Sequence, residues 1–540
     1  MSDSSIVGSA VSFSWPDDTP VFDNLSFSVP GGRTGLVAPN GAGKTTLLKL
    51  ITGELRPTKG TITVHGVLGY LPQHLPFLAE QSIAGVLGVD RTIVALHAIE
   101  AGDTDEENFA VVGNDWDIEE RTRAELNRLG LGDLDLDRRL GTLSGGQVVS
   151  LGLAAELLKR PDVLLLDEPT NNLDSDARER LTAVLRTWTG ALLVVSHDRA
   201  LLDEMDRIAA LDQDGIRWYG GTFTEYEHAV QAEREVAERQ VRNAEQDLKR
   251  QKREMQQARE RAARRASTAS RNLADAGLAR IVAGNLKRDA QVSAAKANET
   301  HSSRVGDAQT RLDQASRAVR KEDRIAIELP GTNVPAGRTV FEGRALQARY
   351  GERLMFAGHG VDLTIRGPER IALTGPNGAG KSTLLRLISG TQTPAAGTAG
   401  HASGRVAYLS QRLDLLDPDR TVAQSLATFA PGLSDPERMN LLARFLFRGA
   451  RAHLPVAVLS GGERLRATLA CILFAEPAPQ LLLLDEPTNN LDLVSVAQLE
   501  SALTAYQGAF VVVSHDERFL AEVGVNRRMR LVAGLLTEVG

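Results

Sequence analysis

The stretch that decides the fold reads Ala38-Pro39-Asn40-Gly41-Ala42-Gly43-Lys44-Thr45, and a second copy reads Gly375-Pro376-Asn377-Gly378-Ala379-Gly380-Lys381-Ser382. Each copy lies between a short apolar run, typical of a buried strand, and a Leu-rich segment that suits the start of a helix. Small residues at such a turn allow backbone N–H groups to surround phosphate oxygens. A chance glycine-rich turn could explain one such string, but two copies with strand, helix, lysine and hydroxyl argue against chance. The sequence therefore predicts two P-loops in an α/β fold.

The side chains of the two P-loops have distinct expected roles. Lys44 and Lys381 would neutralise the β- and γ-phosphates of ATP, and the hydroxyls of Thr45 and Ser382 would be offered to Mg²⁺. One departure is Ala38, which stands where the usual pattern has glycine. If that position needs a positive φ, Ala38 is strained and the first site would bind or turn over ATP less well. The residues expected to bind ATP in the loops are Asn40, Gly41, Ala42, Gly43, Lys44, Thr45, Thr46, Gly375, Pro376, Asn377, Gly378, Ala379, Gly380, Lys381, Ser382 and Thr383.

The same ordered series of shorter motifs follows each P-loop. The first copy consists of Tyr70-Leu71-Pro72-Gln73, Leu143-Ser144-Gly145-Gly146-Gln147, Leu166-Asp167-Glu168, Asn171-Asn172-Leu173-Asp174 and Ser196-His197-Asp198. The second consists of Tyr408-Leu409-Ser410-Gln411, Leu459-Ser460-Gly461-Gly462-Glu463, Leu484-Asp485-Glu486, Asn489-Asn490-Leu491-Asp492 and Ser514-His515-Asp516. This series resembles the nucleotide-binding domains of the ABC ATPase superfamily, over both halves of the chain.

The acidic residues of the third motif suit magnesium and water activation. The apolar runs that end at Asp167 and Asp485 are typical of central parallel strands, whose carboxyl ends are where ligands bind in open α/β sheets. Asp167 and Asp485 would hold Mg²⁺, partly through water. Glu168 and Glu486, one residue further on, would polarise or deprotonate the attacking water.

A histidine ends the last motif of each series. His197 and His515 follow apolar runs, where a lone histidine is more often structural. The ordered repeat instead favours contact with the γ-phosphate, so we count both as catalytic candidates together with the two glutamates.

The ABC resemblance implies that the two domains face each other head to tail, so that ATP is shared. Lys44 would then share a nucleotide with Ser460, Gly461 and Gly462, and Lys381 with Ser144, Gly145 and Gly146. The signature helices would supply a second N-terminus for the anion. The aromatic residues Trp15 and Tyr350 lie where the family stacks a ring on adenine, although either could be an ordinary core or surface residue. Further ATP contacts are expected from Gln147 and Glu463, and contacts with both ATP and Mg²⁺ from Gln73 and Gln411.

The composition suits a protein of the cytoplasm. The chain has 540 residues, 42% of them hydrophobic, which suffices for about three domains. Its single cysteine, Cys471, excludes a disulfide framework and indicates a reducing compartment. The first residues lack the pattern of a signal peptide, and no apolar run approaches the ~18 residues of a spanning helix. We therefore expect a cytoplasmic protein without a membrane segment.

The first domain has an insertion that the second lacks. Gln73 and Gln411 are 338 residues apart, whereas Leu143 and Leu459 are 316 apart. The first domain therefore has about 22 more residues between these two motifs, in or near 90–120. This acidic stretch is more typical of a solvated loop than of an arm that binds a partner.

A helical linker is predicted between the domains. From about residue 225 to 325 the composition changes to Arg, Ala, Gln and Glu, with no proline. Two narrow stripes of apolar or small residues at heptad spacing predict two long helices in an antiparallel coiled-coil hairpin. A first helix of ~45 residues would extend about 65 Å. The predicted domains are thus 1–224, 225–325 and 326–540, and the stripes consist of Ala237, Val241, Ala244, Leu248, Gln251, Met255, Ala258, Ala262, Val305, Ala308, Leu312, Ala315 and Val319.

The linker is basic on an otherwise acidic chain. Residues 231–325 contain 22 Lys and Arg against 14 Asp and Glu, while the whole chain has a net charge of −7. Most Arg-rich helices are solvated spacers. The length of the linker, its segregated charge and its apolar tip instead favour an arm that binds a polyanion through phosphates. The candidate RNA contacts near the tip are Arg261, Arg264, Arg265, Arg271, Arg280, Lys287, Arg288 and Lys296.

The arrangement of two ABC domains, no membrane domain and a helical linker resembles the ABC-F family. The resemblance implies an ATPase, hydrolysing ATP to ADP and phosphate, that binds the ribosome at the tRNA exit site, with the linker directed toward the P-site tRNA and the peptidyl-transferase centre. It also implies a monomer with an intramolecular ATP sandwich, and neither DNA nor a membrane as partner. The long linker and the small insertion are most like the members that protect ribosomes from antibiotics. Two alternatives stay open: a general factor that rescues or regulates stalled ribosomes, and the ATPase subunit of a multidrug exporter.

Overall fold

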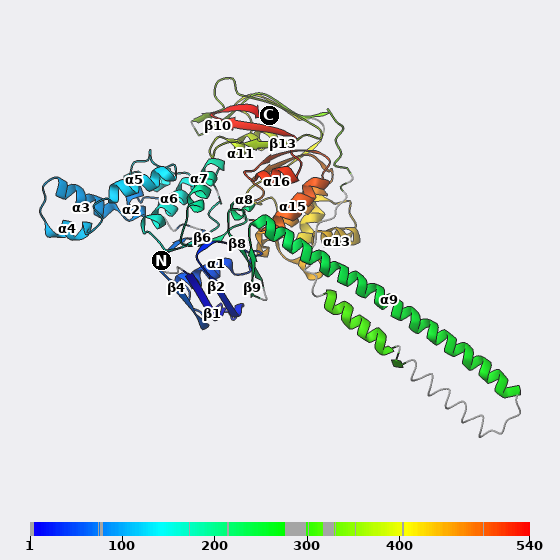
Figure 1. Ribbon diagram of the computed structural model, residues 1–540. Helices are drawn as coiled ribbons and strands as arrows, with labels where there is room; N and C mark the ends of the chain where they lie inside the picture. The colour runs from blue at the N-terminus through cyan, green and yellow to red at the C-terminus, as the bar shows by residue number, and fades with distance from the viewer. Residues whose placement is uncertain are drawn as a thin grey trace. The chain divides into compact units, whose positions relative to one another are not determined.

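The segment between the two P-loop domains is a structural unit of its own. The computed structural model describes residues 5–73, 75, 79–171, 173–212, 215–275, 299–300, 302–316, 329, 331–351, 353–401, 404–489 and 491–539, with residues 265–275 and 353 described by their backbone alone. One compact unit contains both ABC domains, Met1–Phe223 and Asp323–Gly540, and the other is Thr224–Glu322 (Figure 1). In the described part of the chain, no helix is both long and apolar enough to cross a membrane.

A parallel sheet forms the centre of the first ABC domain. Its strand order is β5-β6-β7-β3-β8-β9, and all described neighbours are parallel except β8 and β9 at the edge. Every residue of β6 and β7 is buried, as expected for strands covered on both faces. The strands are β3 (Gly32–Val37), β5 (Leu68–Leu71), β6 (Val163–Asp167), β7 (Ala191–Val195), β8 (Arg207–Asp212) and β9 (Gly215–Gly220).

The first ABC domain also contains an antiparallel sheet of order β2-β1-β4. Its strands are β1 (Ser5–Ser14), β2 (Pro20–Val29) and β4 (Lys59–His65). One apolar cluster joins side chains of this sheet, of the helix after the P-loop and of the parallel sheet, for example Phe27, Leu48 and Leu193. The P-loop helix is therefore fixed between both sheets. The helices are α1 (Lys44–Thr52), α2 (Ile83–Leu87), α3 (Asp90–Glu100), α4 (Glu106–Val112), α5 (Ile118–Arg128), η1 (Leu140–Thr142), α6 (Gly145–Leu158), α7 (Ser175–Arg186) and α8 (Arg199–Leu202).

The second ABC domain repeats this plan. Its parallel sheet has the order β15-β16-β17-β13-β18-β19, and an antiparallel sheet places β10 between β12 and both β11 and β14. The strands are β10 (Thr339–Tyr350), β11 (Arg353–Met355), β12 (Val361–Arg366), β13 (Arg370–Thr374), β14 (Ala396–His401), β15 (Arg405–Leu409), β16 (Pro479–Asp485), β17 (Ala509–Val513), β18 (Arg527–Val532) and β19 (Leu535–Val539). The helices are α11 (Lys381–Ser389), α12 (Val422–Phe429), α13 (Asp435–Arg444), η2 (Gly449–His453), η3 (Val456–Val458), α14 (Gly461–Leu473), α15 (Leu493–Ala505) and α16 (Glu517–Glu522).

The insertion near residues 90–120 is helical rather than the loop that its composition favoured. Helices α3 and α4 lie side by side at the end of this part of the first domain (Figure 1), and Ala95, Leu96 and Val112 form a small buried cluster there. Asp105 caps α4 because its carboxylate accepts a hydrogen bond from the backbone N–H of Glu107 at 3.0 Å. The acidic run therefore begins a helix.

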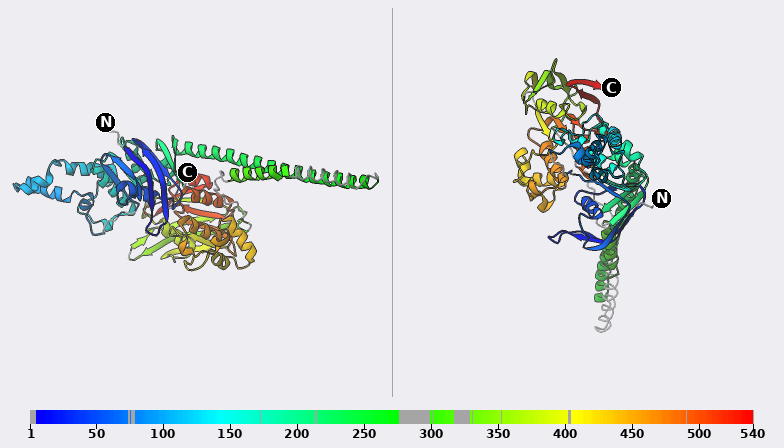
Figure 2. Two further views of the ribbon diagram at one scale, coloured as in Figure 1. Left: turned by 90° about the horizontal axis from the view of Figure 1, so that it is seen from below. Right: turned by 90° about the vertical axis from the view of Figure 1, so that its left-hand side faces the viewer.

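The described part of the linker unit is an antiparallel pair of coiled-coil helices, which confirms that prediction. Helix α9 (Phe223–Asp275) has 53 residues, about 80 Å at the usual rise and longer than predicted. A second helical stretch, 302–316, runs beside α9 in the views of Figures 1 and 2. Leu248 and Ala308 are buried at the predicted heptad positions, and Arg311 lies 3.2 Å from Asp247 across the pair.

Candidate nucleotide-binding sites

Both P-loops lie at the carboxyl end of a central strand. Residues 38–43 connect β3 to α1, and residues 375–380 connect β13 to α11. Each helix follows a left-handed glycine, Gly43 at φ 94° and Gly380 at φ 103°, and begins without a side-chain cap. The first-turn N–H groups therefore have no side-chain partner and suit phosphate oxygens. A Cβ on Gly43 would lie 2.7 Å from Val21, so the loop needs glycine there. This backbone fits ATP.

The strain expected at Ala38 is absent. Among the described residues with positive φ, Ala38 does not occur, whereas its counterpart Gly375 has a φ of 143°. A Cβ on Gly375 would lie 2.2 Å from the carbonyl oxygen of Leu531. The second loop therefore requires glycine at this point, whereas the condition under which Ala38 would be strained is not met in the first loop.

Lys44 is buried among groups from several parts of the first site. Its Nζ donates a hydrogen bond to the carbonyl oxygen of Ala38 at 2.8 Å and lies 2.7 Å from Nε2 of His197. Burial lowers the pKa of Lys44, while the carboxylates of Glu168 and Asp492 oppose that shift. An anionic phosphate would stabilise the ammonium group further.

Glu168 and His197 form a buried pair beside Lys44. Nε2 of His197 lies 3.1 Å from Oε1 of Glu168, and the backbone N–H of His197 donates to Oε2 at 3.3 Å. Burial raises the pKa of Glu168 to about 8 and lowers the pKa of His197 to about 3, so the imidazole is neutral at pH 7. The approach of Nε2 to Oε1 is not a hydrogen bond, and within the described residues neither Oε1 of Glu168 nor Nδ1 of His197 has a hydrogen-bond partner. Both atoms retain capacity for a substrate.

The two aspartates expected to hold Mg²⁺ have different partners. In the first site, the hydroxyl of Thr45 donates to Oδ2 of Asp167 at 2.8 Å. In the second site, the hydroxyl of Tyr408 donates to Oδ2 of Asp485 at 2.9 Å. The hydroxyl of Tyr70, the counterpart of Tyr408, is buried without a partner in the described structure. A carboxylate next to a hydroxyl is a ligand set that suits Mg²⁺, so the first site fits the ion directly.

The second site has the same residue types with looser contacts. Nζ of Lys381 donates to the carbonyl oxygen of Gly375 at 2.7 Å, and burial lowers the pKa of Lys381. Glu486 accepts a hydrogen bond from the Asn489 amide, and its Oε1 lies 4.0 Å from Nε2 of His515. Burial raises the pKa of Glu486 and lowers the pKa of His515 to about 4. The second site therefore has the residues needed for the roles that the sequence predicted for it.

Both candidate catalytic glutamates have a left-handed backbone, which the sequence did not reveal. Glu168 has a φ of 51° and Glu486 a φ of 46°. The N–H of Glu168 donates to the carbonyl oxygen of Val195 at 2.8 Å, and the N–H of Glu486 donates to that of Val513 at 2.9 Å, each on the neighbouring strand. A residue with a Cβ pays about 1–2 kcal/mol for this conformation. Its repetition in both domains indicates that the turn serves the position of the carboxylate.

Each P-loop is contacted by an aspartate of the opposite domain. The backbone N–H of Asn40 donates to Oδ2 of Asp492 at 2.8 Å, and that of Asn377 donates to Oδ2 of Asp174 at 3.3 Å. The other carboxylate oxygen of Asp492 caps α15 by accepting from Ser495 N–H at 2.8 Å, and Asp174 caps α7 in the same way. Sequence reasoning quoted these aspartates within a motif but gave them no role. Their contacts join the two domains at both P-loops.

The signature serines begin helices through capping boxes. The hydroxyl of Ser144 accepts from the N–H of Gln147 at 3.3 Å, and Ser460 makes the same contact with Glu463. The glycines Gly145 and Gly461 are the first residues of α6 and α14. The sharing of a nucleotide with the opposite P-loop stays a prediction.

The other residues expected to bind ATP lie at the surface. Trp15 is 41% exposed and stands edge-on to Phe13 with ring centroids 5.3 Å apart. Tyr350, at the end of β10, is 72% exposed. Gln73 and Gln411 are exposed in the segments after β5 and β15. Stacking on adenine and binding of Mg²⁺ by these four residues stay predictions.

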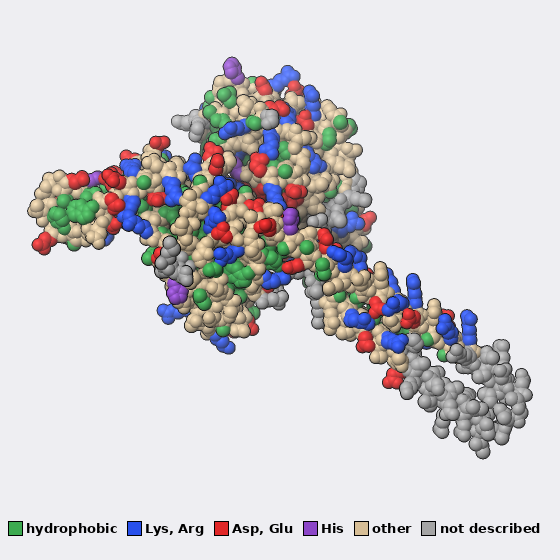
Figure 3. Space-filling view, viewed as in Figure 1, with side chains coloured by type: hydrophobic (Ala, Val, Ile, Leu, Met, Phe, Trp, Pro, Cys, Tyr) green, Lys and Arg blue, Asp and Glu red, His purple; other side chains and the backbone are tan. Residues whose placement is uncertain are grey.

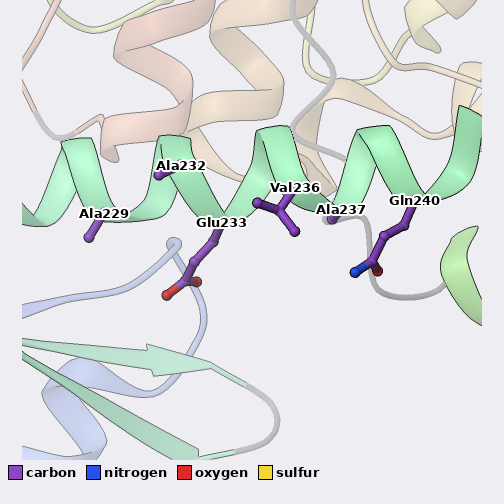
Figure 4. A pocket seen from close by; sticks show the side chains of 6 residues that line it. All are labelled: Ala229, Ala232, Glu233, Val236, Ala237 and Gln240. Carbon is purple, nitrogen blue, oxygen red and sulfur yellow. The ribbon is translucent and has the colours of Figure 1, made fainter.

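The linker residues fall partly outside the described structure. Arg261 and Arg264 are exposed on α9, and Lys and Arg side chains are frequent along the described hairpin (Figure 3). Figure 4 shows an open hollow nearer the start of α9, lined mainly by alanine and valine and including no residue expected to bind ATP. Of the remaining predicted RNA contacts, Arg265 and Arg271 have only their backbone described, and Arg280, Lys287, Arg288 and Lys296 lie outside the described residues.

Comparison with known proteins agrees with this geometry. The family model described as ABC transporter matches residues 22–171 and 358–489. The chain is 34% identical to the tylosin resistance ATP-binding protein TlrC of Streptomyces fradiae over 537 residues, which cover 93% of each chain. The chain belongs to the ABC-F family. This ABC-F protein is also 30% identical to the energy-dependent translational throttle protein EttA of Mycobacterium tuberculosis, over 93% of its own length and 87% of EttA. A solved structure of RNase-L inhibitor has the same fold, with a TM-score of 0.56, 19% identity and coverage of 94% and 85%.

Proposed function

We propose that this ABC-F protein is a cytoplasmic ATPase that binds the ribosome at the tRNA exit site and protects it from antibiotics. The observation that carries the proposal is the similarity to TlrC, which extends over 93% of both chains and therefore includes the linker as well as the ABC domains. A protein similar only in its ATP sites would not share the linker.

The geometry of the two sites supports ATP hydrolysis. The N–H groups of each P-loop and the buried Lys44 and Lys381 would hold the phosphates, and Asp167 with Thr45 would bind Mg²⁺. Bound Mg²⁺ would neutralise charge on the phosphates. Glu168, beside the neutral His197, would orient a water, and the ionised form of its carboxyl would accept the proton. The second site would use Asp485, Ser382, Glu486 and His515 in the same roles.

The linker supports a ribosomal RNA or tRNA partner. A basic hairpin on an acidic protein is attracted to phosphate backbones, and a helix of 53 residues reaches far beyond a compact domain. We infer that it extends from the exit site toward the P-site tRNA and the peptidyl-transferase centre. A role as a general translation factor is the second candidate, favoured by the similarity to EttA.

The ribosome part of the proposal is tested with the double variant E168Q/E486Q. Without the carboxylates the ATP-bound state should persist, so the variant should co-sediment with ribosomes in ATP and slow translation. The variant K44A/K381A is the matched control, because it keeps both glutamates but lacks the phosphate-binding cations. Recovery of E168Q/E486Q in the membrane fraction, with none pelleting with ribosomes, would favour an exporter subunit and exclude the proposal.

Resistance needs its own measurement. Expression of the wild-type chain in a sensitive bacterium should raise the inhibitory concentration of tylosin, the drug in the name of TlrC, and E168Q should reduce that effect. If tylosin and other drugs of the peptidyl-transferase centre and exit tunnel act equally with and without the protein, protection is excluded. Ribosome pelleting of E168Q/E486Q would then support the general factor.

A further inference from the structure

A buried ion pair joins the two ABC domains beside the first site. Nη1 of Arg199 lies 2.7 Å from Oε1 of Glu500, and Nη2 lies 3.4 Å from Oε2. The side chains are only 7% and 14% exposed. Arg199 is two residues after His197 and opens α8, whereas Glu500 lies on α15 of the second domain. The pair therefore connects the histidine segment of the first site to the opposite domain.

The same helix of the second domain also contacts the P-loop of the first site. Asp492 caps α15 and accepts the N–H of Asn40 at 2.8 Å, and Glu500 follows about two helical turns later. Helix α15 thus contacts two parts of one site, the loop that would hold phosphate and the segment that carries His197. Both contacts cross the domain boundary.

Among the residues that the structure describes, the second site has no ion pair at the equivalent positions. The repeated motifs of the two domains are 318 residues apart at the glutamate and at the histidine, so Arg199 corresponds to Glu517 and Glu500 to Thr182. Thr182 donates its hydroxyl to the carbonyl oxygen of Arg178, in its own helix, at 2.8 Å. In the described structure, the bidentate contact between Arg199 and Glu500 is therefore not repeated at the corresponding residues of the second site.

Burial makes this contact sensitive to separation of the domains. A guanidinium and a carboxylate removed from water need each other, because either one alone would be an uncompensated buried charge. Separation of the domains would return both groups to water and release the histidine segment. The neighbouring Asp198 pairs with Arg178 of its own domain at 3.0 Å, whereas Arg199 pairs with Glu500 of the opposite domain.

We propose that Arg199 and Glu500 are a positioning pair through which the second ABC domain holds His197 in place, so that hydrolysis at the first site depends on domain closure more strictly than at the second. The proposal rests on the proposed ATP hydrolysis and adds an asymmetry to it. Neither residue is assigned a contact with ATP.

The test uses two variants of the full chain, E486Q and E168Q, each of which keeps one of the two candidate catalytic glutamates. In E486Q, where only Glu168 remains, E500Q should slow single-turnover phosphate release about tenfold or more, since small misplacements of catalytic groups have effects of this size. In E168Q, where only Glu486 remains, E500Q should change the rate less than about twofold. The charge exchange R199E/E500R should restore part of the first-site rate, which loss of an ordinary structural contact would not predict.

The matched control is a second ion pair between these domains, Arg518 and Asp203, which is 4.0 Å long and about one-third exposed. In E486Q, the added substitution R518Q should leave the rate of phosphate release from the first site unchanged. The inference is overturned if E500Q has no effect in E486Q, if it slows both sites equally, or if the exchange restores nothing. If E500Q folds poorly, R199K, which keeps the charge but loses the planar fork, should still slow only the first site. A parent E486Q that releases no phosphate would instead refute hydrolysis at the first site, and the inference with it.

Discussion

Replacement of Asp492 by asparagine should weaken closure of the domains on ATP. Asp492 uses Oδ1 to cap α15 and Oδ2 to accept the N–H of Asn40. Burial raises the pKa of Asp492, but hydrogen bonds from the backbone of Asn40 and from Ser495 outweigh it, and the pKa lies below its usual value. The carboxylate is therefore ionised in both contacts. Asparagine has one carbonyl oxygen and can keep only one of them.

The size of the effect follows from the lost contact. A hydrogen bond to a charged group contributes about 1.5–3 kcal/mol. Because each 1.4 kcal/mol is a factor of ten, half-saturation should need roughly 10 to 100 times more ATP. D174N should have a smaller effect, since its contact with Asn377 is 3.3 Å long rather than 2.8 Å.

The assay is binding of a fluorescent ATP analogue to E168Q/E486Q with and without D492N or D174N. T421A is the control for the loss of a helix cap, because Thr421 caps α12 and is not among the residues expected to bind ATP. This variant should lower stability by about 1 kcal/mol without changing ATP affinity. Equal affinities for D492N and its parent, or a larger loss for D174N than for D492N, would refute this reasoning.

Three further predictions concern the P-loop and the linker. G375A should lower the free energy of unfolding and of ATP binding at the second site by about 1–3 kcal/mol, because its Cβ would meet the Leu531 carbonyl. A38G should change the ATP affinity of the first site little. Thermal melting measures the stability of each variant, and titration with ATP measures its affinity. L248A should destabilise the hairpin by about 2–4 kcal/mol and lower the helical circular dichroism on heating, and an unchanged melting curve would contradict the coiled-coil seam. Ribosome binding should weaken steeply between 50 and 200 mM salt, as counterion release requires; binding independent of salt would exclude phosphate contacts as its main source.

Local patterns in the sequence predicted most of the architecture. The two P-loops, the central strands before Asp167 and Asp485, and the coiled-coil seam at Leu248 are each encoded by neighbouring residues or by a heptad period. The burial of these segments follows from the same patterns.

Features that depend on distant neighbours were not predictable in this way. Whether position 38 needs glycine depends on how closely a neighbouring strand approaches the loop. In the second domain, glycine is needed at the corresponding Gly375 because a Cβ there would meet the carbonyl oxygen of Leu531. The contacts of Asp492 and Glu500 with the first domain join residues about 300 or more apart. The helical insertion also depended on packing, because Leu96 and Val112 are too few to form a clear periodic pattern.

The left-handed backbone of Glu168 and Glu486 costs local stability, but it positions the carboxylates that are proposed to activate water. Glycine tolerates this conformation without the cost that a Cβ imposes, so E168G or E486G should relieve local strain by about 1 kcal/mol while removing the carboxylate. Natural selection for folding alone would favour glycine at both turns. If both halves hydrolyse ATP as proposed, the chemistry of the carboxylate explains a glutamate at each turn, and glycine at either turn in a related protein would mark a half that only binds ATP.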